Sequence, residues 1–224
     1  LDREQLHKAE RLIARLRATG VTACRSGARR LPDLPEGQRI LVAGQIEGGA
    51  SSEAGCTGPV RTNRALLAKV RAARPDAILL FLPHPDIEPG RLSGAPAEAE
   101  VAGLADAVLS GVDAAAALAA CHEVWTLTSV LGCDALARGH PVTCLGAPFY
   151  AGWGLTDDLA PVPARRAAAR PGLAALVHAA LIAYPRYLDP VSGLPCPVEV
   201  ALDRIEAGPT PRRGAGGRAL ATAQ

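Results

Sequence analysis

The chain alternates short apolar runs with longer amphipathic segments, and this alternation restricts the folds open to it. The runs are rich in Val, Ile and Leu and have the composition of buried strands, whereas the segments between them have the apolar spacing of helices. Strands separated by helices in this way indicate a parallel sheet with helices on both faces. We therefore expect an α/β, Rossmann-like fold. The predicted strands are 39–44, 76–82, 123–127 and 141–146, and the predicted helices are 3–18, 61–73, 113–121, 129–139, 172–184 and 197–206.

Composition excludes several classes of protein. With 224 residues, of which 49% are hydrophobic, the chain can bury a sizeable core. The longest apolar run, around "AILLFLP", is far shorter than the ~20 residues of a membrane span, so we expect no transmembrane segment. The 24 basic and 22 acidic residues leave a net charge of +2, which gives no reason to expect nucleic acid as a partner.

The six cysteines do not predict a metal site or a disulfide framework. They form no C-x-x-C pair and have no Cys/His spacing typical of zinc ligands. Cys121, Cys133 and Cys144 lie in apolar segments. We expect them to be buried thiols in a reducing compartment.

The two ends of the sequence differ from its middle. Residues 208–224 are rich in Gly, Ala and Arg and lack the apolar content to pack, so we expect a disordered tail after one α/β domain of residues 1–207. The sequence opens at Leu1 and contains no Met. We expect it to be part of a longer protein.

Polar residues follow the first two predicted strands. Ligands of an open parallel sheet bind beyond the carboxyl ends of its strands, so these residues are candidates for a site. Gln45 and Glu47 lie among small residues after the first strand, and "PHPD" after the second holds His84 between two prolines. The prolines stiffen the backbone and would aim the imidazole at a phosphate or carboxylate. A histidine that caps a turn begun by Asp86 is the alternative.

Thr128 and Ser129 follow the third predicted strand and open a helix. Their hydroxyls, together with the unpaired N–H groups and the dipole of a helix N-terminus, would favour a phosphate. An ordinary helix N-cap is the alternative interpretation.

An aromatic loop follows the fourth predicted strand. Three of the seven aromatic residues of the chain, Phe149, Tyr150 and Trp153, fall in "LGAPFYAGWGLTDD", where Gly152 and Gly154 flank Trp153. Rings set between glycines are expected of a platform for a sugar or nucleobase. Rings that plug the edge of the sheet are the alternative. The polar residues Thr156, Asp157 and Asp158 directly after the rings favour the rim of a site.

Four stretches together resemble a known family. "GQIEGGAS", "PHPD", "EVWTLTSVLGCDALARGHPVTCLGAPFYAGWGLTDD" and "YPRYLDP", in this order, resemble the capsular polysaccharide β-Kdo transferases of the KpsC/LipA type, which initiate the lipid-linked poly-Kdo linker of bacterial capsules. The resemblance runs from about the first helix to residue 206, and 125–158 is its most specific part. Such enzymes carry two transferase modules in tandem. The match is to the nucleotide-binding half of one module, nearer to the second.

The resemblance implies one lobe of a two-lobed, GT-B-like glycosyltransferase that uses CMP-β-Kdo as donor and retains the anomeric configuration. It implies no cofactor or metal, a lipid-linked glycan as acceptor, and a cytoplasmic location with peripheral contact to the inner membrane or the capsule export machinery. His84 and Ser129, with Thr128, would hold the CMP phosphate, as histidine-proline and serine motifs do in bacterial sialyltransferases. The implied donor-binding set is Gln45, Ser51, His84, Thr128, Ser129 and Gly132.

Two departures from the family pattern bear on catalysis. Retention through a covalent intermediate needs a carboxylate nucleophile, and the family pattern after the first strand resembles Q-V-E-D-D-A-S. Here Gly48 and Gly49 replace both aspartates, and Leu82 stands where the family tends to have Lys. Either Glu47 acts instead, or the module binds without transferring, or another module performs the chemistry. A different α/β enzyme, such as a nucleotide-sugar epimerase, is a further alternative, although few acid or base groups remain in the loops.

Overall fold

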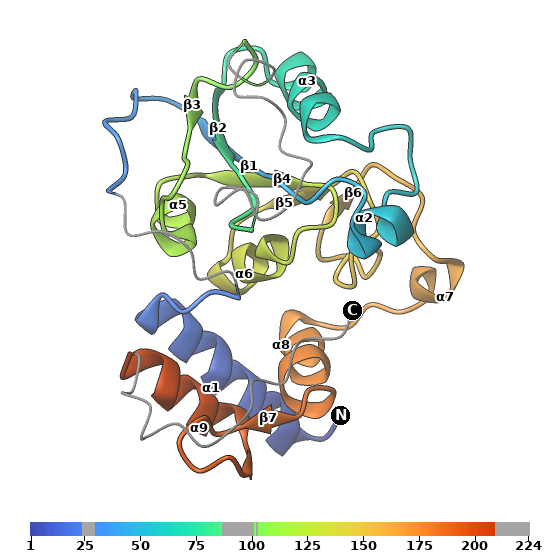
Figure 1. Cartoon of the computed structure of the whole chain (residues 1–224). Coiled ribbons are helices and arrows are strands. Elements are labelled where there is room, and N and C mark those ends of the chain that lie inside the picture. Colours follow the sequence, from blue (N-terminus) through green and yellow to red (C-terminus); the bar gives the residue numbers. More distant parts are fainter. Residues whose placement is uncertain (24–29, 87–100, 102, 209–224) are drawn as a thin grey trace.

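The computed structural model describes residues 1–23, 30–86, 101 and 103–208. Its centre is one six-stranded sheet in the order β3-β2-β1-β4-β5-β6, in which every neighbouring pair is parallel (Figure 1). The predicted parallel sheet is therefore confirmed. The outermost strands were not predicted from the sequence, because each is only two residues long. The strands are β1 (Arg39–Ala43), β2 (Ile78–Leu82), β3 (Ala107–Val108), β4 (Glu123–Thr126), β5 (Val142–Cys144) and β6 (Asp157–Asp158).

Helices cover both faces of the sheet. Successive residues of a strand point to opposite faces, so Leu41 and Leu80 pack with the helices of one face, and Val42 and Phe81 pack with α3 on the other. The central strands are buried on both faces, which explains their continuous apolar runs. The covering helices are α5 (Ala114–Ala119) and α6 (Leu131–Arg138) on the first face and α3 (Asn63–Ala73) on the second.

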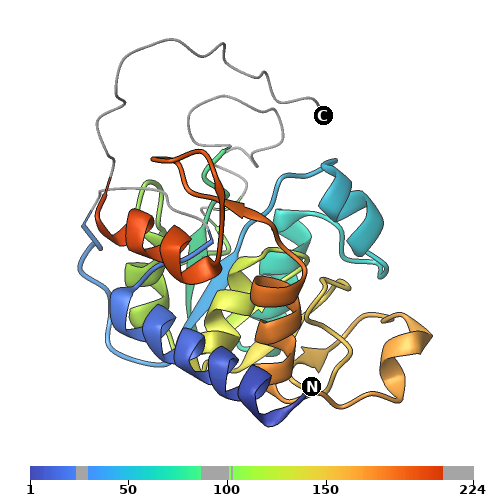
Figure 2. The ribbon, with the colours of Figure 1, turned by 90° about the horizontal axis from the view of Figure 1, so that it is seen from below.

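A second helical layer lies on the side of α6 that faces away from the sheet (Figures 1 and 2). It has an apolar cluster of its own, in which α1 contributes Leu12 and Leu16 and α8 contributes Val177. Residues 172–184, predicted as one helix, begin as an α-helix and continue as a π-helix. The layer consists of α1 (Arg3–Thr19), α8 (Leu173–Val177), the π-helix η1 (His178–Ala183) and α9 (Val198–Glu206), beside a hairpin of β7 (Tyr187–Leu188) and β8 (Pro195–Cys196).

Some of the remaining expectations concern described residues, and others concern residues that the structure does not describe. Cys121, Cys133 and Cys144 are buried and free, as predicted, and burial raises the pKa of each thiol to about 12. Among the described helices, none combines the length and the apolar character that crossing a membrane requires. Residues 209–224 of the predicted tail, and Cys24, lie outside the described residues.

Asn63 fixes the chain where it leaves β1. Its side-chain oxygen accepts a hydrogen bond from the Gln45 backbone N–H at 3.0 Å, and its side-chain nitrogen donates to the Gln45 carbonyl at 2.9 Å. Asn63 is 1% exposed and is the first residue of α3. Both backbone groups of a buried loop residue are therefore satisfied by one amide side chain, which ties the β1 loop to α3.

We predict that Asn63→Ala lowers the free energy of unfolding by ~2–4 kcal/mol, because it leaves two buried backbone groups unpaired and each costs about 1–3 kcal/mol. Urea denaturation followed by circular dichroism measures this loss. Thr62→Ala is the matched control, since it removes only the N-cap hydrogen bond to Ala65 of the same helix, worth ~1 kcal/mol. Equal losses in the two variants would contradict the role given to Asn63.

Candidate functional site

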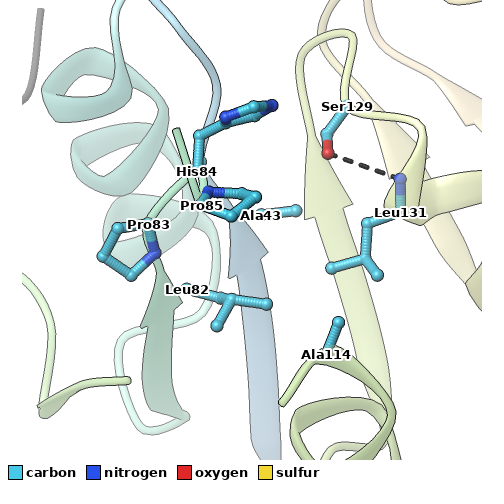
Figure 3. Close-up of a pocket in the computed structure, with 9 residues that line it drawn as sticks. Ala43, Leu82, Pro83, His84, Pro85, Ala114, Ser129 and Leu131 are labelled. Atoms are coloured by element: carbon cyan, nitrogen blue, oxygen red, sulfur yellow. Dashed lines mark hydrogen bonds between the residues drawn. The ribbon is translucent and has the colours of Figure 1, made fainter. Parts of the chain in front are cut away.

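A pocket lies at the carboxyl ends of β1, β2 and β4 (Figure 3). The strand order reverses between β1 and β4, and such a reversal opens a crevice in which α/β proteins bind ligands. His84, from the loop after β2, and Ser129, from the loop after β4, lie on opposite sides of this pocket. Ala43, Leu82, Ala114 and Leu131 add apolar walls. The structure therefore brings together two of the residues predicted to bind a phosphate.

His84 presents a neutral imidazole to this pocket. The backbone N–H of Asp86 donates to Nδ1 at 3.2 Å, so in the neutral ring the proton is on Nε2. Partial burial lowers the pKa of His84 below its ordinary value, although the Asp86 carboxylate, 3.9 Å away, acts in the opposite direction. At neutral pH, His84 can therefore donate a hydrogen bond from Nε2. The turn-capping alternative also holds in part, because His84 accepts from the turn that follows it.

Ser129 precedes α6, which begins at Leu131 rather than at residue 129 as predicted. Its backbone N–H donates to Thr126 Oγ1 at 3.1 Å, and its Oγ accepts from the Leu131 N–H at 3.4 Å. Accepting this bond leaves the hydroxyl proton available to a ligand. Ser129 thus serves the start of the helix and can still donate into the pocket.

Gln45 and Thr128 are bound to each other. Thr128 Oγ1 donates to Gln45 Oε1 at 2.6 Å, and Gln45 Nε2 lies 3.4 Å from Cys56 Sγ. Both side chains are buried, so they do not present their polar atoms to a donor as the sequence led us to expect. They instead join the loop after β1 to the loop after β4. Ser51, in the short helix α2 (Ala50–Gly55), is exposed.

The carboxylate of Glu47 supports the fold. Its Oε1 accepts a hydrogen bond of 2.6 Å from the backbone N–H of Asn63, at the positive end of α3. The two glycines that follow differ from each other. Gly48 has a φ of +73°, which disfavours other residues, whereas Gly49 is the extended N-cap of α2 with φ −75°. A side chain at Gly49 would meet Ile46 atoms no closer than 3.4 Å, so position 49 can hold an aspartate.

Tyr150 differs from its predicted role as an exposed platform. Its ring is fully buried, and its hydroxyl donates to the Ser129 carbonyl. Gly132, in the first turn of α6, permits this approach, because a Cβ there would lie 2.2 Å from the Tyr150 hydroxyl. Tyr150 therefore has no free ring face for a sugar, and Gly132 makes room for Tyr150.

A buried arginine, Arg166, holds the rest of the aromatic loop. The guanidinium of Arg166, in α7 (Ala164–Ala167), donates to the carbonyls of Pro148 and Ala151 at 2.6 and 2.8 Å and covers the Trp153 ring. Trp153 is half-buried against the core, which fits the plug interpretation, whereas Phe149 is 42% exposed. Of the three rings, Phe149 is the most accessible to a ligand.

The two glycines and the polar end of this loop have structural roles. Gly152 and Gly154 have φ values of +84° and +79°. Asp158, predicted to mark the rim of a site, instead accepts from the Gly152 N–H at 2.8 Å and from Thr156 Oγ1 at 2.7 Å.

Sequence reasoning missed two residues that shape the site, Asn63 and Arg166. Asn63 follows Thr62 at a predicted helix start, where a polar residue resembles an ordinary cap. Arg166 lies in the Ala- and Arg-rich stretch "ARRAAAR", which has the composition of a solvated surface. Only the packed structure shows that both side chains are buried.

Comparison with known proteins identifies the family. Residues 3–187 match the family model described as capsule polysaccharide biosynthesis protein. Lipopolysaccharide-processing protein LpsZ of Rhizobium meliloti is 35% identical over 201 residues, which cover 88% of this chain and 45% of LpsZ. Capsule polysaccharide modification protein LipA of Neisseria meningitidis serogroup A is 42% identical over 151 residues, which cover 67% of this chain and 21% of LipA. The chain thus spans less than half the length of these relatives.

Two solved structures of KpsC from Thermosulfurimonas dismutans share the fold. The one described as a beta Kdo 2,7 transferase is 32% identical with a TM-score of 0.74, over 92% of this chain and 62% of that one. The one described as a beta Kdo 2,4 transferase is 25% identical with a TM-score of 0.78, over 92% and 64%. The match of the family model over most of the sequence, the relatives and the fold together show that the chain belongs to the capsule polysaccharide Kdo transferase family of the KpsC/LipA type and has the α/β fold of one lobe of a GT-B-like glycosyltransferase.

Proposed function

We propose that the chain binds CMP-β-Kdo at the pocket between His84 and Ser129, as the donor lobe of a retaining β-Kdo transferase. The proposal rests on one observation: these two side chains line the same pocket, at the point where the strand order of the sheet reverses. The Nε2–H of His84 and the hydroxyl of Ser129 would donate to the single phosphate of the nucleotide. Charge-assisted hydrogen bonds of this kind are stronger than neutral ones.

The acceptor follows from the relatives. The names of these relatives refer to capsule polysaccharide and lipopolysaccharide, so we propose a lipid-linked glycan as acceptor. Phe149 is the candidate for contact with this glycan, because its ring is exposed and packs against Tyr150, whose hydroxyl contacts the Ser129 carbonyl. A cytoplasmic position with peripheral contact to the inner membrane or the export machinery belongs to the same proposal.

Transfer by this lobe would be weak as the sequence stands. A covalent mechanism needs a carboxylate, and the positions that hold aspartates in the family pattern are Gly48 and Gly49. Glu47 is nearby, but one of its oxygens is bound to the start of α3. These two observations favour the second candidate function, a non-catalytic module that binds the nucleotide or glycan for a capsule biosynthesis or export protein.

The donor site predicts a specific loss of CMP affinity. His84→Ala and Ser129→Ala should each weaken CMP binding about tenfold or more, because a hydrogen bond to a charged group contributes ~1.5–3 kcal/mol. Titration calorimetry with CMP measures the dissociation constants. His7→Ala is the control, since His7 is exposed on α1 in the outer helical layer. A wild-type protein that binds CMP equally well after both site substitutions would place the nucleotide elsewhere.

Restoring an acidic residue in the loop after β1 tests whether this protein can catalyse the transfer. In a protein that carries both lobes, Gly49→Asp should raise the release of CMP from CMP-Kdo above that of the parent, because it supplies a carboxylate at a position with room for a side chain. Chromatographic measurement of free CMP over time gives the rate. Gly49→Asn is the matched control, since asparagine caps α2 as well as aspartate does but offers no nucleophile.

Glu47→Gln completes this test. Glutamine keeps the oxygen that accepts from the Asn63 N–H, so the substitution should leave the fold and the parent rate nearly unchanged. A parent that turns over rapidly and loses its activity in Glu47→Gln would show that Glu47 is the nucleophile. Equal rates for the Asp and Asn variants would remove position 49 from the chemistry and favour the binding module.

A further inference from the structure

We infer that Tyr150 is a positioning residue that holds Ser129 in place for the phosphate of the donor. The inference rests on the proposed function, because it concerns the same pocket. Tyr150 itself does not line that pocket. Its hydroxyl instead contacts the main chain of Ser129, whose side chain does line it.

The peptide groups on both sides of Ser129 are fixed. Thr126 Oγ1, at the end of β4, accepts from the Ser129 N–H at 3.1 Å. On the other side, the Ser129 carbonyl accepts from the Tyr150 hydroxyl and from the Gly132 N–H, the latter at 3.2 Å. A residue held at both its N–H and its carbonyl has little freedom to rotate its Cα, and the direction of its hydroxyl is set by that Cα.

Burying the hydroxyl of Tyr150 costs free energy, and the need to fill the core does not explain why a hydroxyl is there. Burial of a polar group is unfavourable unless it is paired, and a phenylalanine would fill the same space without a polar atom. The ring also packs edge-on against Phe149, with centroids 5.2 Å apart, a contact that phenylalanine would keep. Burial raises the pKa of Tyr150 well above its ordinary value, so the hydroxyl keeps its proton and stays a donor. The hydroxyl therefore has two polar partners, the Ser129 carbonyl and the Thr126 side chain, and Thr126 also accepts from the Ser129 N–H, so both partners connect the hydroxyl to Ser129.

The local sequence is adapted to this contact. A Cβ at position 132 would lie 2.2 Å from the Tyr150 oxygen and 2.6 Å from its Cζ, so only glycine admits the ring against the first turn of α6. A hydroxyl that donates to a phosphate must be placed within about 0.5 Å to keep its full effect. Tyr150 of the aromatic loop and Gly132 of α6 together supply that placement.

The test compares the loss of the hydroxyl of Tyr150 with the loss of the hydroxyl of a second tyrosine, Tyr187, which lies outside the pocket. Tyr150→Phe removes the bond to the Ser129 carbonyl, and the control Tyr187→Phe removes a 2.8 Å bond from a tyrosine hydroxyl to the Leu181 carbonyl in the outer helical layer. Each loses a tyrosine hydrogen bond and should lower the melting temperature, Tyr187→Phe by about 2–4 °C and Tyr150→Phe by at least as much, because its hydroxyl is fully buried. Only Tyr150→Phe should weaken CMP binding, by about three- to tenfold, which is part of the loss expected for Ser129→Ala.

A double-mutant cycle separates positioning from a general loss of structure. If Tyr150 acts through the Ser129 side chain, Tyr150→Phe should change the CMP dissociation constant less than about twofold in a Ser129→Ala background. An undiminished effect in that background, or unchanged affinity in Tyr150→Phe alone, would overturn the inference while leaving the donor site intact. Failure of the wild-type protein to bind CMP, or of Ser129→Ala to weaken it, would instead overturn the proposed function and with it this role.

Discussion

The parallel pairing of β1 with β4 is the constraint on which the rest of the molecule depends. β1 and β4 are the two central strands of the sheet, and the chain builds outward from them, first from β1 through β2 to β3 and then from β4 to β6. Because the connections must be right-handed, the helices of the two halves cover opposite faces and leave a crevice between the strand ends. The pocket, the loops that line it and the residues that hold those loops all follow from this one pairing.

Buried polar side chains, rather than exposed ones, give the crevice its shape. Asn63 satisfies the backbone of the β1 loop, and Thr128 joins this loop to the β4 loop through Gln45. Such networks are specific when every member is paired, because an unpaired member in a low dielectric is costly. The β1 and β4 loops are therefore held by their own interior contacts, and an incoming ligand would need to order little in these two loops.

The sequence was sufficient for the four central strands of the sheet and for part of the site, and the reason differs for each. Central strands are buried on both faces, so their apolar runs are unmistakable, and parallel strands bring their carboxyl ends together, which places His84 near Ser129. Gln45 and Thr128 could not be assigned in this way, since the groups that suit a ligand also suit each other. Tyr150 was predicted to be part of a platform for a ligand because its loop sets aromatic rings between glycines, and only the packed structure shows the space that Gly132 leaves for it.

The backbone conformation of Gly49 affects how the sequence of such a lobe can change during evolution. As the N-cap of α2 in an extended conformation, this residue needs only its main chain to begin the helix, and glycine there is within a few tenths of a kcal/mol of aspartate. Folding thus hardly distinguishes glycine from aspartate at position 49. Selection for stability would not preserve an acid at this position, so a lineage in which another module supplied the chemistry could lose it by drift and still fold as before.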